Sequence, residues 1–275
     1  MKIAQFYHKG LIRSGIIEGD RIFPLKFEGD MIDVIMNGGP DGYERDAAIP
    51  LSGVRLAPPI ARPSKIVALG LNYLDHAEES KGKIPLSPVV FAKFPSSLIG
   101  HMDTITWDKT ITGKVDFEAE LAVIIGKTAC RIPEKDAMKA VFGFTCANDV
   151  SARDLQFGDV QWVRGKSLDS FCPLGPWIVT SDDLPDPHAL TIQCRVNNAL
   201  MQNSHTGRMI FRIPAVVSFL SKHFTLNPGD IILTGTPSGV GTFREPPVYL
   251  SNGDEVTVEI EGIGRLVNRC SVMDR

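Results

Sequence analysis

Short alternations of apolar and polar residues fill the first 57 positions of the chain. Three such runs, at residues 3–7, 12–18 and 21–24, are separated by turns that contain glycine. A strand sends successive side chains to opposite faces, so this two-residue period predicts β-strands. We therefore expect a small, β-rich N-terminal domain over residues 1–57.

A proline-rich stretch follows at residues 58–64. Its three prolines, Pro58, Pro59 and Pro63, exclude it from a helix interior and from a central strand. We expect a linker there, followed by a second domain over residues 65–275.

In the second domain, runs of strand length outnumber helical patterns. Helices are expected over residues 134–141 and 214–223, and Asn197-Asn198 predicts a tight hairpin turn. Strands are expected at residues 65–69, 89–93, 117–125, 190–196, 230–233 and 255–260. Strands and helices do not alternate regularly, which favours a mixed α/β, mainly β fold, a mixed β-sandwich or roll, over a Rossmann sheet.

An acidic strand is the first candidate for chemistry. Over residues 115–123 the two-residue period places Asp116, Glu118 and Glu120 on one face. A solvated acidic surface is one explanation. However, residues 121–125 are apolar on both faces, so the strand enters a core, where neighbouring carboxylates require a cation. Their hard oxygen ligands suit Mg²⁺, Mn²⁺ or Ca²⁺.

Asp149 is a candidate third ligand. It follows the apolar run at residues 141–147, and functional residues are common where a strand gives way to a loop. The alternative role is local, because an aspartate in this position can also stabilise a turn over residues 151–154.

His76 and Glu79 are three residues apart, so one helical turn would put both on the same face. A histidine oriented by a carboxylate is typical of a general base. The same spacing also occurs in ordinary surface pairs.

Several cations and one glycine-rich loop are further candidates. Lys93 ends an apolar strand, where burial of its charge would require an anion. From the sequence pattern alone, Arg153 and Lys166 would be interpreted as surface charges. The glycines of residues 234–241 let backbone N–H groups approach a ligand, although no Lys-Ser/Thr follows as in a phosphate-binding loop.

The amino-acid composition limits the kinds of partner that the protein is expected to bind. The 275 residues carry 29 Lys and Arg against 32 Asp and Glu, a net charge of -3, so no broad basic surface is expected for nucleic acid. The five cysteines form no C-x-x-C pair, and we expect them to be buried, reduced thiols. Neither a signal-peptide pattern nor an apolar run of roughly 18 residues is present, which predicts a cytoplasmic protein without membrane contact.

Six strings in this order and spacing resemble the fumarylacetoacetate hydrolase family. They are GLNYLDHAEE (70–79), FAKFPSSLIG (91–100), VDFEAELAVIIG (115–126), ANDVSARDLQ (147–156), RGKSLDSFCPLGPW (164–177) and LTGTPSGVG (233–241). The resemblance implies a mixed β-roll catalytic domain behind a small N-terminal domain, usually in a homodimer. It also implies Mg²⁺ or Mn²⁺ held by Glu118, Glu120 and Asp149.

The same resemblance implies roles for the other candidates. His76 would be the base, oriented by Glu79, and Lys166 would hold a substrate oxygen. The substrate-binding set would be Lys93, Arg153, Gln156 and Thr236. The histidines at positions 101, 188, 205 and 223 have no partner pattern and are expected to be structural or surface residues.

The expected function is hydrolysis of a carbon–carbon bond in an acylpyruvate or related diketo acid, with water activated by His76. Oxaloacetate decarboxylation and 2-oxo-acid isomerisation are alternatives, because both use the same metal-chelated substrate. A metal-stabilised scaffold without turnover is the non-enzyme alternative, and His76 with Glu79 argues against it. A metal-dependent phosphoesterase is disfavoured by the lack of a second metal-binding cluster in the sequence.

Overall fold

The computed structural model describes residues 1–273, and its first strands form the expected antiparallel meander. Apolar side chains such as Ile3 and Ile16 are buried on this sheet, and Met31 and Val34 of the short helix pack onto the same core. The elements of this region are β1 (Lys2–His8), β2 (Leu11–Glu18), β3 (Arg21–Pro24), α1 (Met31–Met36), β4 (Ile49–Pro50), the 3₁₀ turn η1 (Leu51–Gly53) and β5 (Arg55–Leu56).

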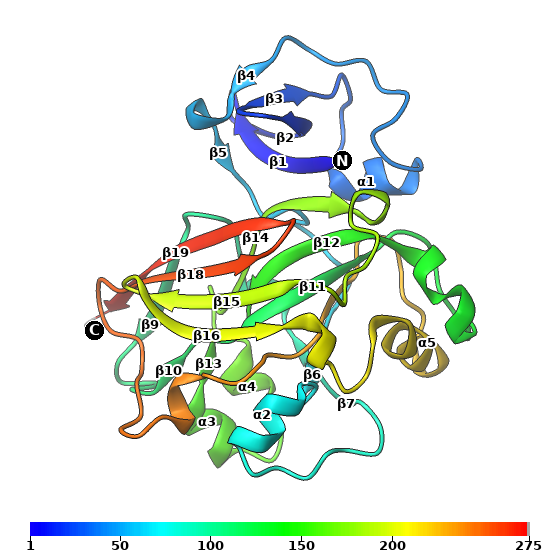
Figure 1. Ribbon diagram of the computed structural model, residues 1–275. Helices are drawn as coiled ribbons and strands as arrows, with labels where there is room; N and C mark the ends of the chain where they lie inside the picture. The colour runs from blue at the N-terminus through cyan, green and yellow to red at the C-terminus, as the bar shows by residue number, and fades with distance from the viewer. Residues whose placement is uncertain (274–275) are drawn as a thin grey trace.

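The N-terminal strands are joined to the rest of the chain by more than the proline-rich linker. Lys2 and Ile3 of β1 pair with Val179 and Ile178 of β14 (Cys172–Thr180), so the meander continues into the main sheet. Gln5 is buried at the junction, where its Nε2 donates to the Pro58 carbonyl at 2.9 Å. In Figure 1 the meander forms a smaller lobe above β14.

The main sheet places the acidic strand at its centre. Its order, over the described residues, is β4-β3-β2-β1-β14-β12-β11-β17-β6-β7, with β5 and β8 beside it. The remaining strands of this sheet are β6 (Ile66–Gly70), β7 (Val89–Lys93), β8 (Leu98–Ile99), β11 (Ala119–Ile125), β12 (Val141–Asn148) and β17 (Ile231–Leu233). All seven residues of β11 are buried, as the apolar run at residues 121–125 predicts.

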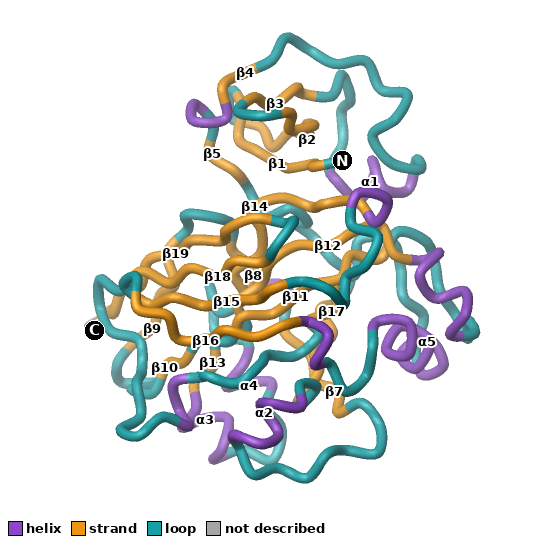
Figure 2. The backbone as a smooth tube through the Cα atoms, in the orientation of Figure 1, coloured by secondary structure: helices purple, strands orange, loops and turns teal. Residues whose placement is uncertain are grey.

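A second sheet packs against β11 and β12 and shares one apolar core with them. Its order is β16-β15-β18-β19-β9, and the packing of two sheets confirms the expected mixed, mainly β architecture (Figure 2). Its strands are β9 (Thr104–Asp108), β15 (Thr191–Val196), β16 (Ala199–His205), β18 (Glu255–Ile260) and β19 (Gly264–Met273). The Asn197-Asn198 hairpin is confirmed, with φ of 49° and 67° at the two residues.

The helices are short and few. Figure 1 places α2, α3 and α4 at the end of the molecule away from the N-terminal lobe. The α-helices that follow the N-terminal lobe in the chain are α2 (Leu74–Glu79), α3 (Arg153–Gly158), α4 (Val163–Lys166) and α5 (Ile213–His223). The 3₁₀ turns are η2 (Pro95–Ser97), η3 (Glu134–Ala140), η4 (Ser181–Asp183), η5 (Thr206–Arg208) and η6 (Gly241–Phe243).

Three expectations need correction. The strand expected at residues 117–125 begins only at Ala119, and the alternating run at residues 115–123 is interrupted, because β10 (Val115–Asp116) pairs with β13 (Ser151–Ala152). The helix expected at residues 134–141 is the 3₁₀ turn η3. Cys130 is exposed, whereas the other four cysteines are buried, and all five are free thiols.

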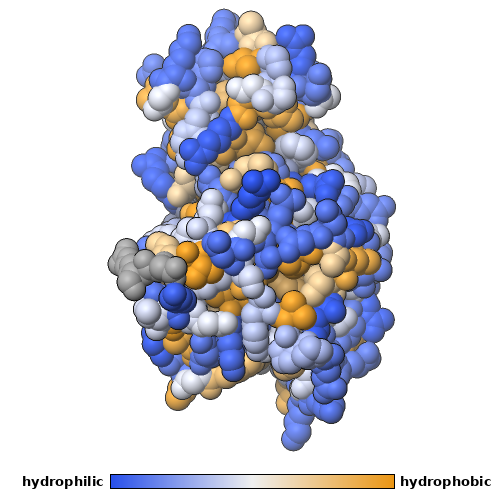
Figure 3. Space-filling view, turned by 90° about the vertical axis from the view of Figure 1, so that its left-hand side faces the viewer, coloured by the Kyte–Doolittle hydropathy of each residue, from blue (hydrophilic) through white to orange (hydrophobic). Residues whose placement is uncertain are grey.

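No helix within residues 1–273 combines the length and the apolar character needed to cross a bilayer. On the face shown in Figure 3, hydrophobic and hydrophilic residues are interspersed over both lobes.

Candidate metal centre and active site

Three buried carboxylates converge at one end of the β11–β12 pair. Glu118 lies in the break before β11, Glu120 lies in β11, and Asp149 follows β12 directly. The antiparallel register pairs Ala119 with Asn148, which brings the residues on either side of that pair together. The Asp149 N–H donates to the Glu118 carbonyl at 3.0 Å, and ligand oxygens of the three carboxylates lie within 4.8 Å of one another.

Three buried cations surround these carboxylates. Lys166 Nζ bridges Glu118 Oε2 at 2.8 Å and Asp149 Oδ2 at 2.7 Å. Lys93 Nζ lies 2.6 Å from Asp149 Oδ1 and also donates to the Lys166 carbonyl. Arg153 Nη1 lies 2.7 Å from Glu118 Oε1. The anion that a buried Lys93 requires is therefore Asp149, and none of the three cations is a surface charge.

Asp116 joins the cluster through Arg153, and not as a neighbour of Glu118 and Glu120 on one strand face as the alternating pattern predicts. Its Oδ2 accepts from Arg153 Nε at 2.8 Å, and its carboxylate also accepts from the N–H groups of Phe117, Gly241 and Thr242. Asp116 is not among the convergent carboxylates of the described residues. Its carboxylate holds Arg153 and the end of the glycine-rich loop at Gly241 and Thr242.

The charges of the cluster do not balance. With Asp116 there are four carboxylates against three cations, and no ion pair among the described residues reaches Glu120. Burial opposes ionisation of Glu118, but Lys166 and Arg153 outweigh it and lower its pKa to about 2. Burial, reinforced by Asp149 and Glu118, raises the pKa of Glu120 well above its usual range.

These observations fit a divalent cation. Glu120 Oε2 accepts from the Gly235 N–H at 2.7 Å, but its Oε1 is buried without a hydrogen-bond partner. A buried acceptor of this kind requires a ligand, and three carboxylate oxygens are the donors that Mg²⁺ and Mn²⁺ prefer. Glu118, Glu120 and Asp149 are thus suited to hold such an ion, as predicted from the sequence.

The expected His-Glu pair is formed on α2. His76 Nδ1 and Glu79 Oε2 lie 2.9 Å apart, and both side chains are largely buried. Glu79 Oε1 accepts from the Gly239 N–H at 2.8 Å, which anchors the pair to the glycine-rich loop. The centroid of the His76 ring lies 5.8 Å from that of the Phe243 ring. The dyad and Glu120 are therefore held by the same glycine-rich loop, the dyad through Gly239 and Glu120 through Gly235.

The helix that carries the dyad is docked on the second sheet. Asp75 Oδ2 accepts from Ser204 Oγ of β16 at 2.5 Å, and Arg208 Nε lies 3.7 Å from the same carboxylate. This contact joins α2 to the second sheet. The sequence string around His76 contained Asp75 but gave no indication of its partners.

The remaining candidates are buried in the same region. Gln156 Oε1 accepts from Arg153 Nη1 at 2.9 Å. Thr236 Oγ1 donates to the Ala119 carbonyl at 3.0 Å and accepts from Gln202 Nε2 at 2.8 Å. Sequence reasoning missed Gln202, which also accepts from the Ala119 N–H and so holds the start of β11. Only strand pairing brings Gln202 there, and no local motif marks it.

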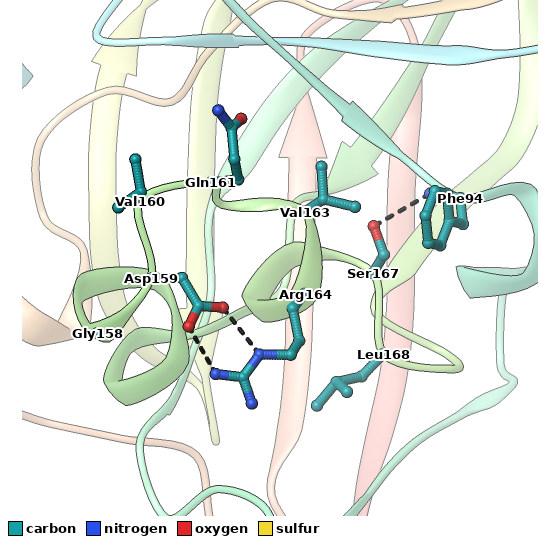
Figure 4. A pocket seen from close by; sticks show the side chains of 9 residues that line it. All are labelled: Phe94, Gly158, Asp159, Val160, Gln161, Val163, Arg164, Ser167 and Leu168. Atoms are coloured by element: carbon teal, nitrogen blue, oxygen red, sulfur yellow. Dashed lines mark hydrogen bonds and ion pairs between the residues drawn. The ribbon is translucent and has the colours of Figure 1, made fainter.

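The outer face of α3 and α4 is hollowed (Figure 4). A cavity of about 710 Å³ is lined by Phe94, residues 158–161, Val163, Arg164, Ser167 and Leu168. The Asp159–Arg164 ion pair spans part of it, and Ser167 Oγ accepts from the Phe94 N–H at 3.1 Å. Lys166 lies in the same helix, but its amine contacts the buried carboxylates.

The histidines at positions 101, 188, 205 and 223 lie outside this cluster of charges. Each makes a local hydrogen bond: His101 Nδ1 with the Val267 N–H, His188 Nε2 with the Ile213 N–H, His205 Nδ1 with the Gly207 N–H, and His223 Nδ1 with the Phe219 carbonyl.

Comparisons with known proteins show the family to which this chain belongs. The family model described as "Fumarylacetoacetate (FAA) hydrolase C-terminal" matches residues 65–271. The Bos taurus protein named oxaloacetate tautomerase FAHD2B, mitochondrial, is 50% identical over 223 residues, covering 80% of this chain and 71% of that protein.

Two solved structures extend the similarity to nearly the whole chain. Fumarylacetoacetate hydrolase from psychrophilic Exiguobacterium antarcticum has a TM-score of 0.88 and 38% identity, and maleylpyruvate hydrolase from Sphingobium sp. SYK-6 has 0.82 and 32%. Each alignment covers 99% of this chain and 100% of the other. The resemblance seen in the sequence is therefore confirmed: this chain belongs to the fumarylacetoacetate hydrolase family.

Proposed function

We propose that this chain is a divalent-metal-dependent enzyme that interconverts the keto and enol forms of a short 2-oxo acid, with oxaloacetate as the substrate. The observation that carries the proposal is the His76–Glu79 pair, held beside three convergent buried carboxylates. A relative 50% identical to this chain is named for the same reaction.

Substrate binding would use donors that the buried network leaves free. An ammonium group has three N–H donors, and Lys166 uses two of them on Glu118 and Asp149. Arg153 Nη2 is buried without a partner. Both groups are therefore available to carboxylate or oxo oxygens of an anionic substrate.

The proton transfer would fall to His76. With Nδ1 bonded to Glu79, the imidazole presents Nε2 as the base, and the negative Glu79 stabilises the imidazolium that forms. His76 would take a proton from C3 of the keto acid, whose C–H electron pair becomes the C2–C3 double bond while the C2 carbonyl oxygen gains the charge and then a proton. A bound divalent ion would supply electrostatic stabilisation of that oxygen.

A second candidate is hydrolysis of an acylpyruvate carbon–carbon bond, the function expected from the sequence. It is supported by the similarity to a structure named maleylpyruvate hydrolase and by the same dyad, which would take its proton from water instead of from carbon. Oxaloacetate decarboxylation needs an electron sink but no activated water. It is therefore the reaction least dependent on His76.

The test compares these reactions on one preparation. Enol-oxaloacetate is followed by loss of its ultraviolet absorbance, and pyruvate release is measured from acylpyruvates and from oxaloacetate, each with Mg²⁺ and with Mn²⁺. We expect accelerated enol decay that falls roughly 10²- to 10⁴-fold in His76→Ala, the usual share of a general base. Metal-loaded protein that leaves enol decay at the uncatalysed rate but releases pyruvate from an acylpyruvate would favour hydrolysis. No turnover with any substrate would favour a scaffold.

A further inference from the structure

Lys93 is a buried lysine whose hydrogen bonds all go to groups of the protein itself. It is the last residue of β7, its side chain is 0% exposed, and the family resemblance places it among the substrate-binding residues. Its Nζ lies 2.6 Å from Asp149 Oδ1, and it also donates to the Val150 carbonyl at 3.4 Å and to the Lys166 carbonyl. An ammonium group has three N–H donors, so these three acceptors leave none for a substrate.

Lys93 and Lys166 are joined in two ways. Lys93 Nζ donates to the backbone carbonyl of Lys166, which is the last residue of α4. The two ammonium groups also share one carboxylate, since Lys93 Nζ bonds Oδ1 of Asp149 and Lys166 Nζ lies 2.7 Å from its Oδ2. The three residues form a closed ring of contacts, and a shift of Lys93 would therefore move both the backbone and the ammonium group of Lys166.

Other contacts of β7 support the same helix. The ring of Phe91 lies 5.2 Å from Lys166 Nζ, a distance at which an aromatic ring attracts a cation. The same ring packs edge-on at 5.4 Å against Trp162, the residue before α4. The N–H of Phe94, which follows β7, donates at 3.1 Å to Ser167 Oγ directly after the helix. The end of β7 thus contacts α4 before, at and after Lys166.

The charge of Asp149 alone does not account for this arrangement. Lys166 already pairs with Asp149, and Lys93 brings a second cation to the same carboxylate. A counter-charge would need only the bond to Asp149 Oδ1. The additional bond to the Lys166 carbonyl connects β7 with α4, and it is this bond that gives Lys93 a role in the geometry of the site.

We propose that Lys93 is a positioning residue, which holds Lys166 in place for the substrate and does not itself bind the substrate. The inference rests on the proposed function, in which the remaining N–H of Lys166 binds an oxygen of the oxo acid. Lys93 acts on that N–H through the backbone of α4, whereas a lysine that binds substrate directly would need a donor of its own.

A double-mutant cycle with Lys166 separates positioning from direct binding. The probe is oxalate, a small dianion with the adjacent oxygens of a 2-oxo acid, and calorimetry measures its affinity for protein saturated with Mn²⁺. Lys93→Met removes the ammonium group and keeps much of the side-chain length. We expect it to weaken oxalate binding about 10- to 100-fold, as for other outer groups that orient a binding residue. In the Lys166→Met background it should cause no further loss, and equal losses in both backgrounds would overturn the proposal.

Two more variants keep the test decisive. If Lys93→Met does not fold, Lys93→Gln, which retains an N–H donor without the charge, takes its place in the same cycle. Phe91→Leu removes no charge and should weaken oxalate binding about 2- to 10-fold, the size of a cation–π contact. That loss should also vanish in Lys166→Met, and its persistence there would contradict support of Lys166 by β7.

The matched control is Lys65→Met, which removes an ammonium group from another buried aspartate, Asp230. It should lower the unfolding temperature and leave oxalate affinity unchanged. If Lys93→Met behaves in the same way, Lys93 is only a counter-charge and the proposal is wrong. Wild-type protein that binds no oxalate, or a Lys166→Met variant that binds it normally, would instead overturn the substrate site of the proposed function, and this inference with it.

Discussion

Two of the three convergent carboxylates should respond in opposite ways to the same substitution. Glu118 contacts two cations, Lys166 at 2.8 Å and Arg153 at 2.7 Å, whereas no ion pair of the described residues includes Glu120. A glutamine keeps the shape of glutamate and removes its charge. Glu118→Gln and Glu120→Gln therefore test whether the charge balance derived from the structure is correct.

The magnitudes follow from the contacts that each variant loses. Breaking a buried ion pair costs about 3–5 kcal/mol. Glu118→Gln should fall near the lower end, because Lys166 retains Asp149 and Arg153 retains Asp116. In Glu120→Gln the amide oxygen can still accept from the Gly235 N–H, and the new NH₂ group can donate to the oxygens of Glu118 and Asp149, which lie within 4.8 Å of the Glu120 ligand oxygen. Replacing an unsatisfied acceptor by a paired donor is worth about 1–3 kcal/mol in the opposite direction.

The assay is thermal unfolding in chelator, followed by metal titration. For a chain of this size 1 kcal/mol changes the unfolding temperature by about 2–4 °C. Metal-free Glu118→Gln should therefore unfold several degrees below wild type, and metal-free Glu120→Gln a few degrees above it. Both variants should bind Mn²⁺ at least about tenfold more weakly, since even outer groups around a metal cost that much. If Glu120→Gln loses as much stability as Glu118→Gln, the conclusion that Glu120 lacks a balancing cation is wrong.

Four further predictions follow from the same structure. Chelation should abolish turnover reversibly while circular dichroism stays nearly unchanged, because a catalytic Mg²⁺ site does not hold the fold together. Glu79→Gln should lower enol conversion by misorienting His76, yet leave Mn²⁺ affinity within a few-fold of wild type; a large loss of affinity would show that Glu79 acts through the metal instead. His188 Nε2 accepts from the Ile213 N–H at 3.1 Å, and burial with the charge of Arg212 lowers the pKa of His188, so stability should be complete above the unfolded pKa of about 6.5 and decline below it. The variant His188→Asn should flatten that decline in unfolding scans at several pH values, and an unchanged slope would assign it to other groups. The homodimer expected from the family resemblance predicts a single dimeric species in sedimentation, and a monomer would count against it.

Local periodicity was enough to predict the framework of this protein. The two-residue alternation located the meander of β1 to β3, and short apolar runs located strands such as β7 and β18. Spacing of three residues paired His76 with Glu79. These features depend on neighbours in the sequence, so a single chain reveals them without knowledge of its fold.

Longer-range features needed the structure. The alternating pattern placed Asp116 with Glu118 and Glu120, but pairing of β10 with β13 breaks the strand and assigns Asp116 to Arg153. Likewise, nothing local indicated that β1 would extend the main sheet by pairing with β14. Strand partners are chosen by packing between segments far apart in the chain, and a local pattern does not specify them.

The sequence by itself thus determined the candidate residues: three carboxylates, a histidine with an orienting glutamate and, in Lys93, a cation at the end of an apolar strand. Only the tertiary structure decided how the charges of these residues are paired. The β11–β12 register sets Asp149 opposite Glu118, and Lys166 is inserted between them from a helix 17 residues further along. Among the described residues no ion pair includes Glu120, and its Oε1 has no hydrogen-bond partner. Charge balance and hydrogen bonding are properties of groups brought together from distant segments, and burial makes their imbalance large enough to direct binding.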